Sequence, residues 1–332
     1  VDPFGGLGDL AAGVLRTPGT PEESFSDDPL RMMRAARFAA QLRFGVDAAV
    51  VEAMTQMAER ISIVSAERVR DELSRLVLAA HPRVGLELMV RTGLAELVLP
   101  ELPALQLEID EHHRHKDGYQ HSLTVLEQAM AMEDRIDAGG PDLVLRLAAL
   151  LHDIGKPRTR RFEPGGGVSF HHHEVVGARM ARQRLTALRY PKHVVDDVSG
   201  LTELHLRFHG YAGGEWTASA VRRYVRDAGP LLSRLHVLTR ADSTTRNRRK
   251  AAALQSSYDD LERRIDELAE AEELERMRPD LDGNAIMEVL GIPAGPTVGQ
   301  AYRHLLELRI QNGPLGEDKA RAALLTWWEQ QG

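Results

Sequence analysis

The stretch "LRLAALLHDIGKPR" places two ionisable residues, His152 and Asp153, at the end of an apolar segment. Apolar residues cover most of the circumference of the helix predicted over residues 142–153, so both groups are expected to leave water with it. Buried charges need partners or a metal ion. The stretch therefore predicts a functional site at a buried helix end. The alternative is a hydrogen-bonded pair with a purely structural role.

Other polar residues fall where they could complete such a site. His121 lies in the first turn of one predicted helix, and Asp242 ends another. Two imidazoles and two carboxylates suit a divalent ion such as Mg²⁺, Mn²⁺, Fe²⁺, Ni²⁺ or Zn²⁺, and an open position on the ion would generate a hydroxide near neutral pH. His173 and His205 could hold a second metal or a phosphate. Lys156, just past the helix end, could hold an anion.

Helices must position these groups, because helical periodicity dominates the chain from residue 30 onward. The predicted fold class is all-α. Residues 1–29 are rich in Gly, Pro, Asp and Ser and are predicted to form loops and turns. The stretch "RRFEPGGGVSFHHH" predicts a short hairpin or loop in which His171 and His172 are exposed. The predicted helices span residues 30–44, 47–60, 65–79, 82–92, 119–136, 142–153, 172–188, 191–206, 217–226, 229–241 and 250–277, and three more follow.

Composition narrows the class of protein. The 332 residues suffice for two or three domains, and 43% hydrophobic with 27% charged residues is typical of a soluble globular protein. There are no cysteines, which excludes disulfides and thiolate metal sites. A net charge of −7 argues against wholesale electrostatic capture of nucleic acid, although local basic faces can still bind it. No apolar run approaches a membrane span, no signal peptide is evident, and a cytoplasmic location is expected.

The order His121, His152, Asp153 and Asp242, with "HDIGK" at its centre, resembles the HD phosphohydrolase superfamily. The resemblance covers residues 115–250 and implies that these four residues are metal ligands. It also implies an all-helical domain that hydrolyses phosphoesters, with His152, Asp153 and Lys156 in its active site.

A second resemblance begins at the N-terminus. The segments "VDPFGGLGDLAAGVLRTPG" and "FSDDPLRMMRAARFAAQLRF" resemble the end of the catalytic head and the neck of class II bacterial tRNA nucleotidyltransferases, the CCA-adding enzymes, and of related poly(A) polymerases. It continues through "AERVRDEL", "HHRHKDGYQHSL" and "DLDGNAIMEVLGIPAGPTVGQA". The resemblance implies nucleotide binding by Asp27, Asp28, Arg31 and Arg34, and it implies the tRNA 3′ end, CTP and ATP as partners.

The chemistry of Asp28 and Arg31 can explain how a site would select CTP and ATP. Asp28 can accept from the exocyclic amino group of cytosine or adenine while Arg31 donates to the ring nitrogen, which admits CTP and ATP and rejects UTP and GTP. Arg34 and Arg37, on the same helix, are expected to contact triphosphate or RNA backbone. The alternative is that Asp28 caps a helix beginning at Pro29.

The two resemblances predict four regions. No Gly-Ser followed by a D-x-D strand occurs in the chain, whereas the family uses such carboxylates to hold two metals. We therefore expect most of the head to lie upstream of Val1, and no CCA addition by this chain alone. The alternatives are a stand-alone HD nucleotide phosphohydrolase and a helical RNA-binding module with an inactive HD site.

The four predicted regions are a head remnant with a flexible loop (1–27), a helical neck (28–108), an HD domain (109–250) and a helical tail expected to bind tRNA (251–332).

Overall fold

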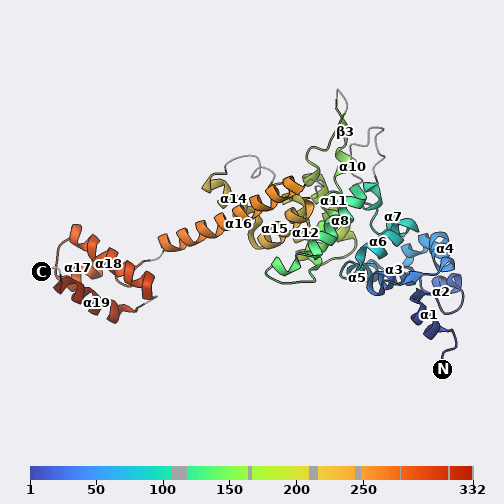
Figure 1. Ribbon diagram of the computed structural model, residues 1–332, viewed down its shortest axis with the longest axis horizontal. Coiled ribbons are helices and arrows are strands. Elements are labelled where there is room, and N and C mark those ends of the chain that lie inside the picture. Colours follow the sequence, from blue (N-terminus) through green and yellow to red (C-terminus); the bar gives the residue numbers. More distant parts are fainter. Residues whose placement is uncertain are drawn as a thin grey trace. The chain divides into compact units, whose positions relative to one another are not determined.

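The computed structural model describes residues 1–106, 118–163, 167–208, 216–243, 248–276, 278–312 and 315–330. Within them the chain is mainly helical, with two small two-stranded sheets, so the predicted all-α class is confirmed (Figure 1). The chain divides into two compact units, Val1–Asp259 and Asp260–Gly332. The predicted boundary between neck and HD domain, at residues 108 and 109, lies outside the described residues.

The prediction of loops throughout residues 1–29 is wrong, because this segment contains two helices and a strand. The Asp2 carboxylate accepts from the amides of Gly6 and Leu7 at 2.8 and 2.9 Å and so begins the first helix. The Thr20 side chain caps the second, which buries Phe25 completely. These caps override the turn-rich composition. The elements are α1 (Gly6–Ala12), β1 (Val14–Leu15) and α2 (Pro21–Asp27).

The helices of the predicted neck pack around α3, whose buried face includes Met33, Ala36 and Ala40. A Cβ atom on Gly85 would lie 2.4 Å from the carbonyl oxygen of Ala36, so this glycine allows α6 to approach α3 closely. Strand β2 pairs in parallel with β1. The elements are α3 (Leu30–Leu42), β2 (Gly45–Val46), α4 (Ala48–Met57), η1 (Ala58–Ile63), α5 (Ala66–Val77), α6 (Pro82–Arg91), α7 (Leu94–Val98) and η2 (Pro103–Leu105).

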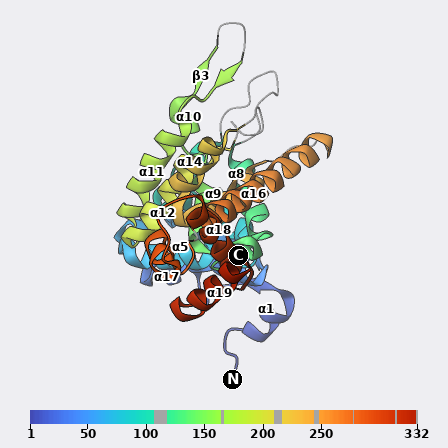
Figure 2. The same cartoon turned by 90° about the vertical axis from the view of Figure 1, so that its left-hand side faces the viewer.

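The next helices form a bundle with α9 at its centre, in contact with α5, α8, α12 and α15. The predicted hairpin is confirmed: β3 pairs antiparallel with β4 and extends beyond α10 (Figures 1 and 2). The elements are α8 (Gly118–Met130), η3 (Glu133–Arg135), α9 (Leu143–Leu151), α10 (Lys156–Thr159), β3 (Arg161–Phe162), β4 (Val168–Ser169), α11 (His173–Ala187), α12 (Lys192–Leu204), α14 (Ala218–Ala228), η4 (Gly229–Leu231) and α15 (Leu232–Asp242).

A long helix, α16 (Arg248–Arg276), and three shorter ones complete the chain. In the second unit, α17 (Gly283–Leu290), α18 (Pro296–Asn312) and α19 (Glu317–Glu329) enclose a separate small core. Its buried members are Leu281, Ile286, Ala301, Leu305, Ala320 and Leu324. Among the described residues, no helix has both the length and the apolar character required to cross a membrane.

One buried arginine joins the predicted neck to the bundle. Arg146, in the middle of α9, donates to both carboxylate oxygens of Glu133 at 2.7 and 2.8 Å. Its remaining nitrogen donates to the carbonyl oxygens of Val77 and Ala79, at the end of α5, at 3.0 and 2.9 Å. Each of the three guanidinium nitrogens thus donates to at least one acceptor, which compensates for the burial of the charge.

We predict that Arg146→Met destabilises the protein by about 3 kcal/mol, because it leaves the Glu133 carboxylate buried without its cation. Denaturant unfolding measures the change. Lys192→Met, at an exposed side chain that pairs with Asp196, should change stability by less than about 0.5 kcal/mol. Equal effects of the two substitutions would contradict a special role for Arg146.

Candidate functional site

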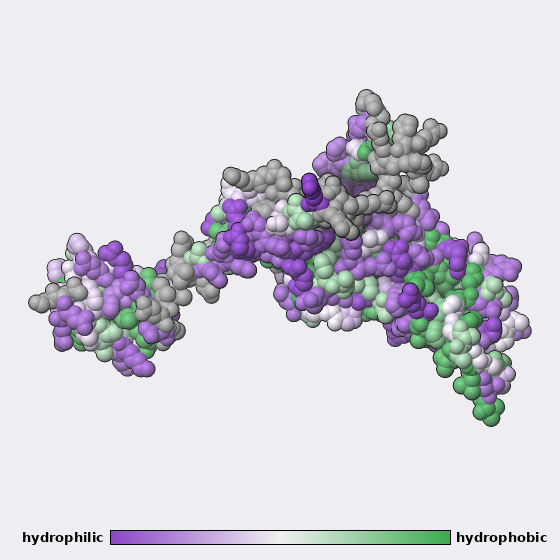
Figure 3. Space-filling model, in the orientation of Figure 1, coloured by the Kyte–Doolittle hydropathy of each residue, from purple (hydrophilic) through white to green (hydrophobic). Residues whose placement is uncertain are grey.

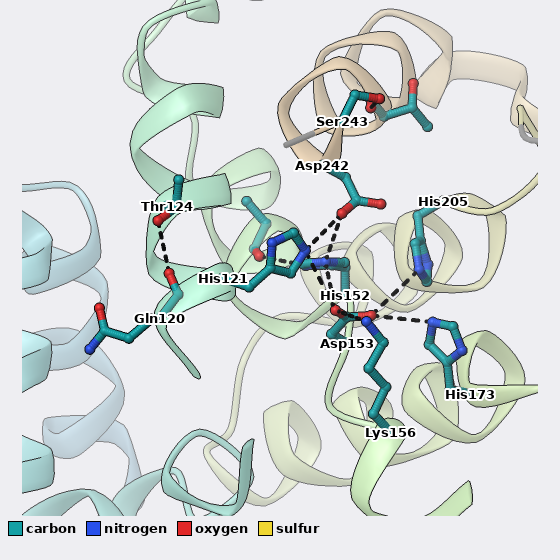
Figure 4. Close-up of polar contacts among 12 residues, drawn as sticks. Gln120, His121, Thr124, His152, Asp153, Lys156, His173, His205, Asp242 and Ser243 are labelled. Carbon is teal, nitrogen blue, oxygen red and sulfur yellow. Dashed lines mark hydrogen bonds and ion pairs between the residues drawn. The ribbon is translucent and has the colours of Figure 1, made fainter. Parts of the chain in front are cut away.

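The predicted pair of ionisable residues, His152 and Asp153, lies at the buried C-terminal end of α9. His152 and Asp153 are 0% and 1% exposed. Helix α8 brings His121 and helix α15 brings Asp242 to the same point (Figure 4). The Nε2 atom of His121 lies 2.9 Å from Asp242 Oδ1 and 3.6 Å from Asp153 Oδ2. That of His152 lies 3.3 Å from Asp153 Oδ2 and 3.5 Å from Asp242 Oδ1.

The two additional histidines join the same cluster from the other side of Asp153. His173 Nε2 lies 3.2 Å from Asp153 Oδ1, and His205 Nε2 lies 4.0 Å from the same oxygen. Two sets of three ligand atoms result, each compact enough for one ion. One set comprises His121, His152 and Asp242, and the other comprises Asp153, His173 and His205.

Three of the imidazoles are held in one orientation by their Nδ1 atoms. Each Nδ1 contacts the carbonyl oxygen three residues earlier in the chain, at 2.9 Å for His152, 2.8 Å for His173 and 2.6 Å for His205. Their Nε2 atoms point into the cluster and, among the described residues, form no well-directed hydrogen bond although buried. An Nδ1–H donated to a carbonyl leaves the Nε2 lone pair free, which is the arrangement of a metal-ligating histidine. The donor set therefore fits a divalent cation.

Charge compensation dominates the electrostatics of the cluster. Burial opposes the charged form of His152, yet the carboxylates of Asp153 and Asp242 outweigh it and raise the pKa of His152 to about 10. Burial likewise opposes ionisation of both carboxyl groups, but the surrounding histidines hold their pKa values well below the usual range. Burial, with the charge of His152, lowers the pKa of His205 to about 4. A divalent cation among these groups would replace the proton on His152.

Of three further residues near the cluster, only Lys156 contacts it. Lys156 is about a quarter exposed, and its Nζ lies 2.5 Å from Asp153 Oδ2. It can therefore hold Asp153 and still reach an anion from outside. His171 and His172 are exposed, as predicted, and His172 contacts Glu174 at 3.8 Å. Neither belongs to the ligand sets.

A glycine of the HDIGK stretch holds the second ligand set in place. A Cβ atom on Gly155 would lie 2.1 Å from the carbonyl oxygen of His173 and 2.7 Å from the amide nitrogen of Gly177. Only a glycine lets α11 approach this closely. Sequence reasoning missed this role of Gly155, because its contact with α11 joins segments whose spacing along the chain gives no signal.

The predicted nucleotide-binding residues surround a different part of the molecule. Arg31 and Arg34 line a cavity of about 450 Å³, together with Arg16, Phe25 and Phe38. Arg31 donates to the carbonyl and hydroxyl oxygens of Ser24 at 3.2 and 3.0 Å. This cavity is the neck cavity below.

The two predicted acidic residues of the nucleotide site, Asp27 and Asp28, do not line the neck cavity. Asp28 pairs with Arg68 at 2.8 Å and also accepts from the amide of Leu30 at 3.1 Å, a contact at the start of α3. Asp27 is exposed and lies 3.9 Å from Arg31. Sequence reasoning missed Arg68, because the two residues of this pair are far apart in the chain.

Arg37, which was expected to contact triphosphate or RNA backbone, forms an internal ion pair in the structure. Its Nε lies 2.7 Å from Glu72 Oε2, with both side chains nearly buried, and its guanidinium lies over the Phe38 ring. This internal ion pair, and not exposure toward a ligand, accounts for Arg37 in the structure.

Two family models match parts of the chain. The HD domain family matches residues 118–247, and the family described as "Probable RNA and SrmB-binding site of polymerase A" matches residues 43–105. The chain is 34% identical to the CC-adding tRNA nucleotidyltransferase of Thermus thermophilus, over 92% of this chain and 68% of that protein. It is 35% identical to the A-adding tRNA nucleotidyltransferase of Deinococcus radiodurans, over 99% of this chain and 75% of that protein.

Solved structures agree with the fold. A Bacillus stearothermophilus CCA-adding enzyme in complex with CTP superposes with a TM-score of 0.50 at 22% identity, covering 100% of this chain and 69% of that one. A Thermotoga maritima CCA-adding enzyme complexed with tRNA gives a TM-score of 0.51 at 14% identity, covering 98% and 67%. At these identities the likeness concerns the fold alone.

We predict that Gly155→Ala destabilises the bundle by about 2 kcal/mol or more, because the new methyl group would overlap backbone atoms of α11. Thermal and denaturant unfolding measure this. The matched control is Gly200→Ala, where the new Cβ would meet only a Leu231 methyl group at 3.3 Å and alanine favours the helix by up to about 1 kcal/mol. A Gly155→Ala protein as stable as Gly200→Ala would disprove the close contact.

Proposed function

This chain belongs to the tRNA nucleotidyltransferase family, and we propose that it supplies the nucleotide-selecting neck, the tRNA-binding tail and a metal-dependent HD phosphohydrolase for maturation of the tRNA 3′ end. Relatives in which this chain covers two thirds or more of the length add CC or A to tRNA, as their names state. The hydrolase can be argued from the side chains themselves.

One observation carries the hydrolase proposal: three buried imidazole Nε2 atoms converge on a carboxylate without a well-directed hydrogen bond. Leaving such groups unsatisfied costs about 1–3 kcal/mol each, so a cation that uses them is the natural counterpart. A divalent metal ion bound there would polarise a phosphoryl oxygen and supply a nucleophilic hydroxide. His121, His152, Asp153 and Asp242 would hold it.

The other side chains prepare the site for a phosphoester. The carbonyl contacts at Nδ1 keep the rings fixed, so little reorganisation is needed on binding. Lys156 is placed to bind a substrate phosphate as it approaches Asp153. In the reaction, a water oxygen forms a bond to phosphorus, the P–O ester bond breaks, and the leaving oxygen takes a proton.

We predict divalent-metal-dependent hydrolysis of a simple phosphoester such as p-nitrophenyl phosphate, abolished by EDTA. His152→Asn should lower kcat/KM by more than about 100-fold. Replacing even a residue that only hydrogen-bonds to a metal ligand lowers metal affinity or activity by about 10- to 100-fold. Lys192→Ala, an exposed cation on α12, is the control and should have no effect. Activity that survives His152→Asn or EDTA would disprove the hydrolase.

We further propose that His173 and His205, with Asp153, hold a second cation and not a phosphate. Their Nδ1 atoms contact carbonyl oxygens, so their Nε2 atoms offer lone pairs, whereas a phosphate would need donors. Elemental analysis after equilibration with Mn²⁺ is expected to give two ions per chain, and one ion per chain in His205→Ala. A single ion in the unaltered protein would favour the phosphate alternative.

For the neck cavity, we propose binding of CTP and ATP through Arg31 and Arg34, with Asp28 and Asp27 near its edge. Arg34→Gln should weaken CTP binding by about 10-fold, the loss expected for a hydrogen bond to a charged group. Titration calorimetry measures it, with Arg179→Gln on α11 as an exposed control. If UTP binds as tightly as CTP, the assignment of base selection to this cavity fails.

A further inference from the structure

A second cavity, of about 250 Å³, lies beside the HD cluster, among α12, α14 and α15. Leu204 and Leu235 form its apolar part. Leu204 directly precedes the cluster residue His205, and Leu235 lies two helical turns before Asp242, about 10 Å along the axis of α15. The cavity is therefore lined by the same two helices, α12 and α15, whose ends carry His205 and Asp242. It is called the α14 cavity below.

Aromatic rings also line the α14 cavity. Trp216 and Tyr224 both line it, and their rings meet edge to face at 5.6 Å between centroids. Tyr224 in turn stacks on His236, with ring planes 8° apart. Aromatic walls beside leucines suit a flat ring, and stacking of a nucleic-acid base on such a ring contributes about 1–3 kcal/mol. The volume is below the roughly 300 Å³ at which drug-sized pockets begin, so it suits a single base.

Charged groups at the α14 cavity match the rest of a nucleotide. Arg207 and Arg223 both line it; Arg207 pairs with Asp227 at 3.3 Å. Arg223 is exposed and has no ion pair within the described part of the chain. An uncompensated guanidinium at the edge of an aromatic cavity favours a phosphate. The Asp227 carboxylate offers an acceptor for an exocyclic amino group.

We propose that the α14 cavity binds the base of a nucleotide and that Arg223 contacts its phosphate backbone, so that the HD site acts on nucleotides or RNA ends in preference to other phosphoesters. This inference rests on the proposed hydrolase. A free mononucleotide and the terminal nucleotide of single-stranded RNA share this chemistry.

Binding tests the proposal directly. Titration calorimetry with adenosine 5′-monophosphate and with a short single-stranded RNA ending in CCA is expected to show binding that Trp216→Ala weakens about 10- to 100-fold. Arg223→Glu should weaken it about 10-fold, whereas Arg222→Glu, the same charge change on the neighbouring exposed residue outside the cavity lining, is the control. Trp216→Phe, which keeps a ring, should restore most of the affinity and excludes misfolding as the cause. Dependence on Trp216 for both probes indicates a mononucleotide site, and for the RNA alone an RNA-end site.

Kinetics separate this proposal from the hydrolase itself. Trp216→Ala and Arg223→Glu should each lower the ratio of kcat/KM for adenosine 5′-monophosphate to kcat/KM for p-nitrophenyl phosphate by about 10-fold. An unchanged ratio, together with unchanged affinity for both probes, would overturn the α14 cavity as a nucleotide site while the hydrolase stands. If the unaltered protein hydrolyses neither compound, the proposed hydrolase fails, and calorimetry alone decides the fate of the cavity.

Discussion

Charge compensation at the end of α9 is the constraint on which the rest of the bundle depends. Two carboxylates and three imidazoles whose Nε2 atoms point inward meet at a largely buried point, and burial on this scale is tolerated only if every charge has a partner. Without a metal ion, the carboxylates are compensated by a protonated His152, whose pKa they raise to about 10. A divalent cation would instead bind the Nε2 lone pairs that the fixed rings offer, and it would also supply the chemistry of the proposed hydrolase.

The surrounding helices serve that one point. Helices α8, α9, α11, α12 and α15 each place one or two of the candidate ligands, and most of these residues lie at the first or last turn of a helix. Gly155 permits α11 to come close enough for His173 to reach Asp153. Arg146 joins α9 to the end of α5 through two hydrogen bonds to backbone carbonyls. The predicted neck and the helix that ends at the cluster are therefore in direct contact.

Much of this could be predicted, and the failures have physical reasons. The apolar run before His152 and the helix-end positions of His121 and Asp242 led to the right cluster, because burial of ionisable groups is visible in local pattern. Helices α1 and α2 escaped prediction because single caps from Asp2 and Thr20 outweigh a turn-rich composition. The pairing of Asp28 with Arg68 and the role of Arg146 are long-range contacts, which spacing along the chain does not encode.

The central claim is that the cluster at the end of α9 is a metal centre. Crystals grown with Mn²⁺ and measured for anomalous scattering test it most directly. We predict an anomalous peak bonded to Nε2 of His121 and His152 and to the carboxylates of Asp153 and Asp242, with Nδ1 of His152 still on the Ala149 carbonyl. Absence of any peak in the cluster, or a His152 ring turned so that Nε2 contacts the Ala149 carbonyl, would contradict it.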